Sequence, residues 1–210
     1  QKKDKFCNDV YFQKLIKILL NEKNSIIIFS GRLPLYLNKK WFNNLEGGIE
    51  GNDWDENYIS VGKYKSIQDS FKNEIFQLSK NNKIILVYPI PEVGWSLRRK
   101  ILSQWINRDN IFSKDFQLNN ITTSFKVFSN RNESSFKLLD SINNKNIYRV
   151  YPHKLYCNTI IKDRCITHDK TSVFYTDAHH PSSKGSEMIN DLIIEEIKRI
   201  EKIIDKKKGQ

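Results

Sequence analysis

A carboxylate and an imidazole three residues apart are the clearest chemical feature of the sequence. Asp177 and His180 lie in the polar segment 176–183, between a short apolar run and a long amphipathic stretch. At this spacing the carboxylate can accept the Nδ1 proton of the histidine, which fixes the tautomer and leaves Nε2 free to deprotonate a hydroxyl. The pair predicts two of the three members of a Ser-His-Asp triad.

Two other interpretations of these residues remain open from spacing alone. Asp177 can be a turn or capping residue next to two surface histidines, His179 and His180, because both residue types are common in loops. The three side chains can also bind a metal ion, although they supply few ligands on their own. His153 and His168 are too distant in the sequence to be assigned to the site.

The composition indicates a folded chain rather than a disordered polymer or a disulfide scaffold. The sequence has 210 residues, of which 39% are hydrophobic, and three cysteines. We expect one domain over residues 1–210. The formal charge of +11 is spread along the chain and is densest at the two ends, and many lysines alternate with Asn and Ile. We therefore expect no nucleic-acid partner.

The apolar runs also exclude a membrane span within the sequence. None approaches the roughly 20 residues that a bilayer requires, and no apolar signal-peptide segment follows the start. The chain starts at Gln1 in a lysine-rich stretch. We expect it to be processed, trimmed or incomplete, with any targeting information upstream.

Strand-like runs and helical periodicities alternate along the chain. Continuous apolar runs predict strands at 25–30, 83–88, 146–151 and 172–175. Apolar residues at three- and four-residue spacing predict helices at 8–21, 64–80, within 122–143 and at about 184–205, the last with Ser183 as N-cap. This alternation is typical of a three-layer α/β/α sandwich with a mostly parallel sheet.

In such folds the ligand lies beyond the carboxyl ends of the strands. The segments that directly follow the predicted strands are Gly31, residues 89–94, the loop after Tyr151, and residues 176–183. The Asp-His pair lies in the last of them, so its position agrees with a site at this edge.

Several segments resemble a known family in the right order. Residues 177–181 fit the D-x-x-H-P block that closes SGNH hydrolases, the GDSL-like esterases and acetyltransferases, and Lys184 and Gly185 open the next helix as in that family. More specifically, the chain resembles the SGNH domain at the C-terminus of membrane-bound acyltransferase family 3 proteins. The segments that carry this resemblance are residues 25–36, 88–95, 156–165 and 174–180.

The resemblance implies an acyltransferase domain at the extracytoplasmic, periplasmic face of a bacterial inner membrane. Such a domain transfers an acyl group, expected to be acetyl, to a hydroxyl of a cell-surface glycan such as lipopolysaccharide O-antigen. An upstream membrane domain would deliver the acyl group, and no metal or bound cofactor is needed. An esterase acting on an acylated carbohydrate is the near alternative. A non-catalytic domain that binds an anionic glycan or a membrane surface is the other.

The family's nucleophile is the serine of a Gly-Asp-Ser block after the first strand, and no such block occurs here. We expect that strand and its serine to precede Gln1, so that this chain alone is inactive. Ser30, at a predicted strand end, is the alternative nucleophile. The resemblance places Gly31 where a backbone N–H helps to form the oxyanion hole.

The pocket is expected to include Arg32, Glu92, Gly94 and His179. The usual hydrolase Gly-x-Asn block should follow the second strand of this chain, but residues 89–94 contain no side-chain amide. No second oxyanion donor can therefore be assigned from the sequence.

The cysteines agree with an extracytoplasmic location. Cys157 and Cys165 bracket a short polar loop that a disulfide could close, with two reduced cysteines in a cytosolic protein as the alternative. Cys7 is left without a partner in the sequence.

Overall fold

The computed structural model describes residues 9–51, 64–106 and 120–208, and a parallel three-stranded sheet in the order β1-β2-β4 lies at its centre. The strands are β1 (Ile26–Phe29), β2 (Lys83–Val87) and β4 (Ile147–Val150). Ile26 pairs with Lys83, and Ile84 pairs with Ile147. The predicted strands at 25–30, 83–88 and 146–151 are confirmed.

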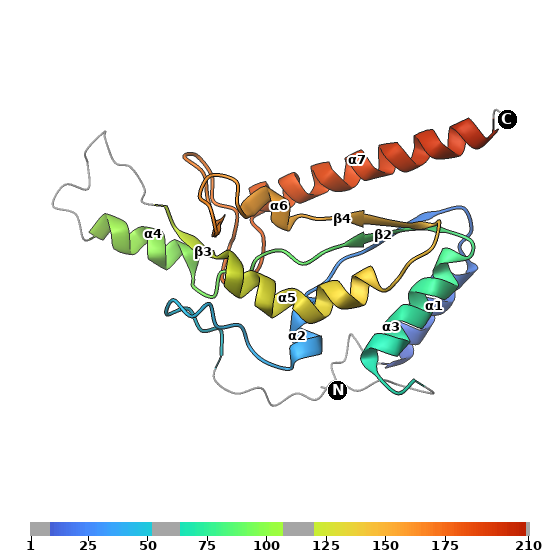
Figure 1. Ribbon diagram of the computed structural model, residues 1–210, viewed down its shortest axis with the longest axis horizontal. Coiled ribbons are helices and arrows are strands. Elements are labelled where there is room, and N and C mark those ends of the chain that lie inside the picture. Colours follow the sequence, from blue (N-terminus) through green and yellow to red (C-terminus); the bar gives the residue numbers. More distant parts are fainter. Residues whose placement is uncertain (1–8, 52–63, 107–119, 209–210) are drawn as a thin grey trace.

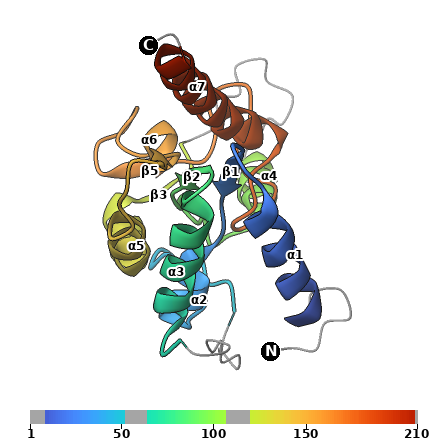
Figure 2. The same ribbon diagram turned by 90° about the vertical axis from the view of Figure 1, so that its right-hand side faces the viewer.

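Helices cover both faces of this sheet (Figures 1 and 2). One face carries α1 (Asp9–Asn21), α3 (Ile67–Ser79) and α5 (Phe125–Asp140), and the other carries α7 (Ser183–Lys208). Side chains alternate along β2, so Ile84 and Leu86 pack toward α3 and α5, whereas Ile85 and Val87 pack toward α7. The expected three-layer α/β/α sandwich is confirmed.

Five short elements were not predicted from the sequence. They are α2 (Leu33–Asn38), α4 (Leu97–Ile106), β3 (Thr122–Ser124), α6 (His153–Tyr156) and β5 (Arg164–Ile166). Strands β3 and β5 form a separate antiparallel pair. The Ser124 hydroxyl at the end of β3 accepts the N–H of Val127 and so caps the start of α5.

Two local predictions were wrong. Residues 172–175 form no strand, because their hydrogen bonds go to neighbouring loops: Phe174 N donates to Thr167 O, and Phe174 O accepts from Ser182 N. The cap of α7 is Ser182 rather than Ser183, since the Ser182 hydroxyl accepts the N–H of Gly185 at 3.1 Å.

The expected disulfide between Cys157 and Cys165 is present, with an S–S distance of 2.02 Å. It joins the end of α6 to β5, two segments that also pair backbone to backbone at these residues. Cys7 lies outside the described residues. Within the three described ranges, no helix is both long enough and apolar enough to cross a bilayer.

Gly185 allows the first turn of α7 to approach the segment that leads into the Asp-His loop. A Cβ at this position would lie 2.2 Å from the carbonyl oxygen of Phe174. The Tyr156 hydroxyl also donates to the Gly185 carbonyl at 3.2 Å. Any side chain at residue 185 would therefore push the helix away from this loop.

We predict that Gly185→Ala lowers the free energy of unfolding by about 1–3 kcal/mol, because the added methyl group overlaps backbone that cannot rotate away. Denaturant unfolding of the two proteins measures the difference. Gly31→Ala is the matched control, since nothing lies within 4 Å of a Cβ at Gly31. Equal midpoints for wild type and Gly185→Ala would contradict the packing described.

His153 lies among aromatic rings at the start of α6. Its ring centroid is 5.4 Å from that of Phe128, 5.3 Å from that of Phe136 and 6.0 Å from that of Tyr151. Its Nδ1 is buried without a hydrogen-bond partner among the described residues. Burial lowers the pKa of His153 to about 4, and the charge of Lys154 adds to this effect.

We predict that His153 makes the fold sensitive to mild acid. The unfolded chain, in which the pKa of histidine is about 6.5, binds this proton more readily than the folded chain does. The contribution is therefore complete above pH 6.5 and is lost as pH falls toward 4. Between pH 7 and pH 4.5, the free energy of unfolding should fall by about 1–2 kcal/mol less in His153→Phe than in the wild type. Parallel pH dependences for wild type and His153→Phe would rule this out.

Candidate active site

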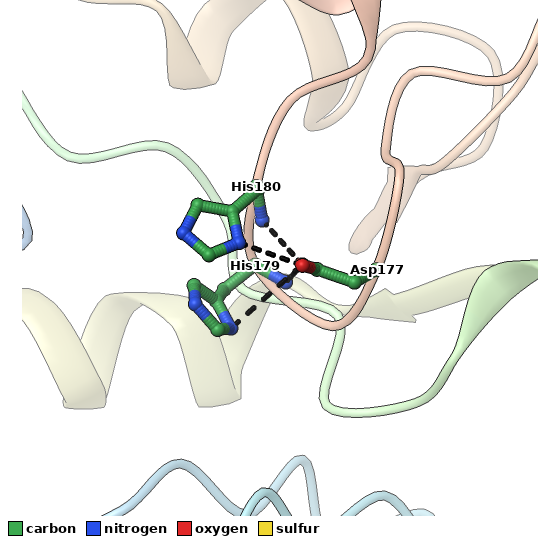
Figure 3. A group of neighbouring side chains, drawn as sticks. All are labelled: Asp177, His179 and His180. Carbon is green, nitrogen blue, oxygen red and sulfur yellow. Dashed lines mark hydrogen bonds and ion pairs between the residues drawn. The ribbon is translucent and has the colours of Figure 1, made fainter.

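The loop that holds Asp177 and His180 is fixed by its own hydrogen bonds. Asp177 Oδ1 accepts the backbone N–H groups of His179 at 2.9 Å and His180 at 2.8 Å, and Oδ2 lies 2.6 Å from His180 Nδ1 (Figure 3). The N–H of Thr176 donates to the carbonyl of His180 at 2.9 Å and closes the turn. The carboxylate thus orders the backbone and orients the ring.

The electrostatics of this pair suit a general base. Desolvation by itself raises the pKa of Asp177, but the N–H groups of His179 and His180 and the His180 ring outweigh it and hold that pKa well below its usual range. An ionised carboxylate beside Nδ1 favours the tautomer that carries its proton on Nδ1. The His180 side chain is 65% exposed, so Nε2 is open to a reacting group.

A metal ion fits these atoms less well than a carboxylate–imidazole pair does. Ligand atoms of Asp177, His179 and His180 lie within 4.8 Å of one another. However, both Asp177 oxygens already accept N–H groups, and Nδ1 of His180 faces the carboxylate. A metal would have to displace the contacts that order the loop.

The segment after β2 stabilises this loop through hydrogen bonds. The N–H groups of Val93 and Gly94 donate to the Ala178 carbonyl at 2.7 and 3.0 Å, and the buried Tyr175 hydroxyl donates to Pro91 O at 2.8 Å. Gly94 has a φ of +80°, which glycine adopts without strain. Since its N–H is used in this contact, Gly94 positions the loop.

A largely buried network of two arginines and two glutamates adjoins the site at His179. Glu92, whose side chain is 4% exposed, accepts from Arg32 Nε at 2.6 Å and from Arg131 Nε at 3.0 Å. Arg32 also binds both carboxylate oxygens of Glu50. The network joins the start of α2, the loop around Glu50, the segment after β2 and helix α5. We call these four residues the charge network.

The charges within the network stabilise one another. Burial alone lowers the pKa of Arg32 and raises that of Glu50. Their bidentate pair, together with Glu92 on the Arg32 side, outweighs this effect, so the pKa of Arg32 is raised and that of Glu50 is lowered. Both groups therefore remain charged at neutral pH.

Sequence reasoning named Arg32 and Glu92 but missed Glu50 and Arg131. Arg131 follows Phe128 by three residues and so falls on the buried stripe of α5, a spacing that could have revealed it. Glu50 lies in a glycine-rich loop with no periodicity, so the sequence carried no comparable signal for it.

His179 connects the charge network to the Asp177–His180 pair. Its Nδ1 lies 3.2 Å from Glu50 Oε1 and 3.9 Å from Asp177 Oδ1. Its ring centroid lies 3.9 Å from that of His180. Burial lowers the pKa of His179, and the Arg32 charge adds to this effect, although Glu50 opposes both.

Three further residues were considered from the sequence: Gly31 and Ser30, which were candidates for the site, and His168, which was not assigned to it. Gly31 follows β1 and faces open space, so its place in an oxyanion hole stays a prediction. The exposed Ser30 makes no hydrogen bond to His180 among the described residues. His168 is buried, and its Nε2 accepts the Ile121 N–H at 3.1 Å, so it supports the β3 region.

We predict that Glu92→Ala lowers the free energy of unfolding by about 3–5 kcal/mol, because it leaves Arg131 buried without a counter-charge and removes one of the two carboxylates that pair with Arg32. Denaturant unfolding monitored by circular dichroism gives this value. The matched control is Glu133→Ala, whose pair with Lys137 is solvent-exposed, and its unfolding midpoint should stay at that of the wild type. Similar midpoint changes in the two variants would contradict a stabilising role for the network.

Comparisons with known proteins place the chain in a family. Residues 1–195 match the family described as the SGNH domain fused to AT3 domains. The periplasmic domain of a lipopolysaccharide acetyltransferase from Salmonella ser. Paratyphi A is a similar solved structure, with a TM-score of 0.43 and 19% sequence identity. That match covers 65% of this chain and 53% of the Salmonella chain, so it spans about half of that protein's length. No curated protein matches the sequence. The chain thus belongs to the SGNH domain family whose members are fused to AT3 domains.

Proposed function

We propose that this chain is the acyl-transferring part of a cell-surface O-acyltransferase. The Asp177–His180 pair carries the proposal, because it holds an imidazole with one nitrogen on a carboxylate and the other open to a hydroxyl. The acyl group is expected to be acetyl, and the acceptor a hydroxyl of a glycan such as lipopolysaccharide O-antigen. Membership of a family fused to AT3 domains supports a membrane partner as the source of the acyl group.

The proposed reaction has two half-reactions on one serine. His180 Nε2 takes the serine proton as Oγ attacks the acyl donor, and the leaving group receives that proton as the acyl-enzyme forms. His180 then takes a proton from the acceptor hydroxyl as this oxygen attacks the acyl carbon, and returns it to serine Oγ. Asp177 holds the ring in place and stabilises its charged form throughout.

We propose that the nucleophilic serine lies outside the 210 residues of this chain. No Gly-Asp-Ser block occurs in the sequence, and Ser30 makes no hydrogen bond to His180 among the described residues. We propose that a segment preceding residue 1 supplies it, and that this chain alone is inactive. The Gly31 N–H is proposed as one donor to the oxyanion.

The proposed location is the periplasmic face of the inner membrane. The Cys157–Cys165 disulfide supports it, because disulfides persist in oxidising compartments and are rare in the cytosol. The high positive charge also suits a surface beside anionic lipid or glycan.

We predict that His180→Ala and Asp177→Asn in the complete gene product each lower glycan acylation by at least about 10³-fold, since both remove the oriented base. Mass spectrometry of glycan from cells that lack the native gene and express each variant measures this. Transfer at the wild-type rate by His180→Ala would exclude the assignment.

Charge reversal at exposed lysines separates catalysis from simple binding. Lys14→Glu with Lys17→Glu alters the exposed face of α1 and should leave acylation unchanged if the Asp177–His180 pair does the chemistry. A non-catalytic glycan- or membrane-binding domain would show the reverse, with activity lost on charge reversal and kept in His180→Ala. An esterase would instead release free acetate from the glycan, in the wild type and in the lysine double variant.

A further inference from the structure

His179 has a carboxylate partner of its own, and the proposed reaction does not use it. Its Nδ1 lies closer to Glu50 than to Asp177, at 3.2 Å against 3.9 Å. Asp177 Oδ1 already accepts two backbone N–H groups, whereas Glu50 is fixed by its bidentate contact with Arg32. Glu50 is therefore the carboxylate that is better placed to orient this ring.

The contact with Glu50 determines which nitrogen of His179 is free. Nδ1 is buried and has no hydrogen bond in the described part of the chain, although a carboxylate oxygen lies within 3.2 Å. A small rotation of the ring would align the two groups, and a proton on Nδ1 is then the favourable tautomer. This tautomer leaves the lone pair of Nε2 as an acceptor.

The two histidine rings present their free nitrogens together. Their centroids are 3.9 Å apart, and in both rings the nitrogen that does not face Asp177 lies on the side away from that carboxylate (Figure 3). Burial and the Arg32 charge lower the pKa of His179, which favours the neutral ring. A neutral Nε2 accepts hydrogen bonds and cannot donate them.

From this geometry we infer that His179 binds the acceptor: its Nε2 accepts a hydrogen bond from one hydroxyl of a vicinal diol while His180 deprotonates the neighbouring hydroxyl. Glu50 acts as the positioning residue for His179. The inference rests on the proposed function and deepens it, because it makes a 1,2-diol the preferred class of acceptor. It also gives the site a means to favour a sugar over water. A sugar diol presents two hydroxyl groups on neighbouring carbons, whereas a water molecule has a single oxygen.

The test uses the purified complete gene product in detergent, with p-nitrophenyl acetate as acyl donor. Release of p-nitrophenol reports formation of the acyl-enzyme, and the ratio of acetyl ester to free acetate reports transfer against hydrolysis. Propane-1,2-diol and propan-1-ol are the two acceptors, matched in carbon number and differing in the second hydroxyl. The wild type should transfer to the diol about tenfold better than to the alcohol.

His179→Asn is the decisive variant, because its side-chain amide can face Glu50 as Nδ1 does but has no counterpart of Nε2. It should reduce the diol preference about tenfold, to that of the simple alcohol, and lower transfer to the diol much more than it lowers p-nitrophenol release. His179→Gln can place an oxygen acceptor near the position of Nε2 and should restore part of the preference.

Different results separate failure of the inference from failure of the proposed function. A wild type without diol preference, or a His179→Asn variant that keeps it, would overturn the inference alone. Equal loss of both readouts in His179→Asn would overturn it too, since His179 would then be structural or the base itself. Unchanged p-nitrophenol release in His180→Ala would refute the proposed function.

Discussion

The Glu92 carboxylate lies between two guanidinium groups at the carboxyl end of the sheet, and the site depends on this buried contact. A carboxylate taken out of water is unstable unless it is paired and hydrogen-bonded. Arg32 and Arg131 supply both requirements from different parts of the chain, and Arg32 extends the contact to Glu50. Four segments that approach this edge from different directions are thereby held in one arrangement. The segment after β2, fixed in this way, then donates two N–H groups to the Asp177–His180 loop.

The loop that holds Asp177 and His180 thus has two independent supports. The first is local, since Asp177 accepts backbone N–H groups from the residues it precedes and can order the turn with little help. The second is the charge network, which reaches His179 through Glu50. The local contacts set the orientation of His180, and the network sets the surroundings of His179. In the proposed reaction, chemistry and acceptor binding therefore depend on different residues of one loop.

Sequence patterns revealed those parts of the molecule that local physics determines. The main strands carry continuous apolar runs, because both of their faces are covered, and the contact between Asp177 and His180 lies within a single turn of the chain. Prediction failed where contacts with other segments of the chain determine the local structure. Residues 172–175 look like a strand, but their backbone hydrogen bonds are taken by residues 167 and 182, and no local pattern records that choice. Glu50 was missed for the same reason, since its partner Arg32 is 18 residues away.

In the proposed mechanism, Asp177 and His180 serve a serine that carries the acyl group. The most direct measurement is to incubate the complete gene product with an isotopically labelled acetyl donor and no acceptor, quench it in acid and locate the label by peptide mass spectrometry. We predict an acetyl ester on one serine that precedes residue 1, present in the wild type and lost in His180→Ala. A label on Ser30, or no acetyl-serine at all in an active preparation, would contradict it.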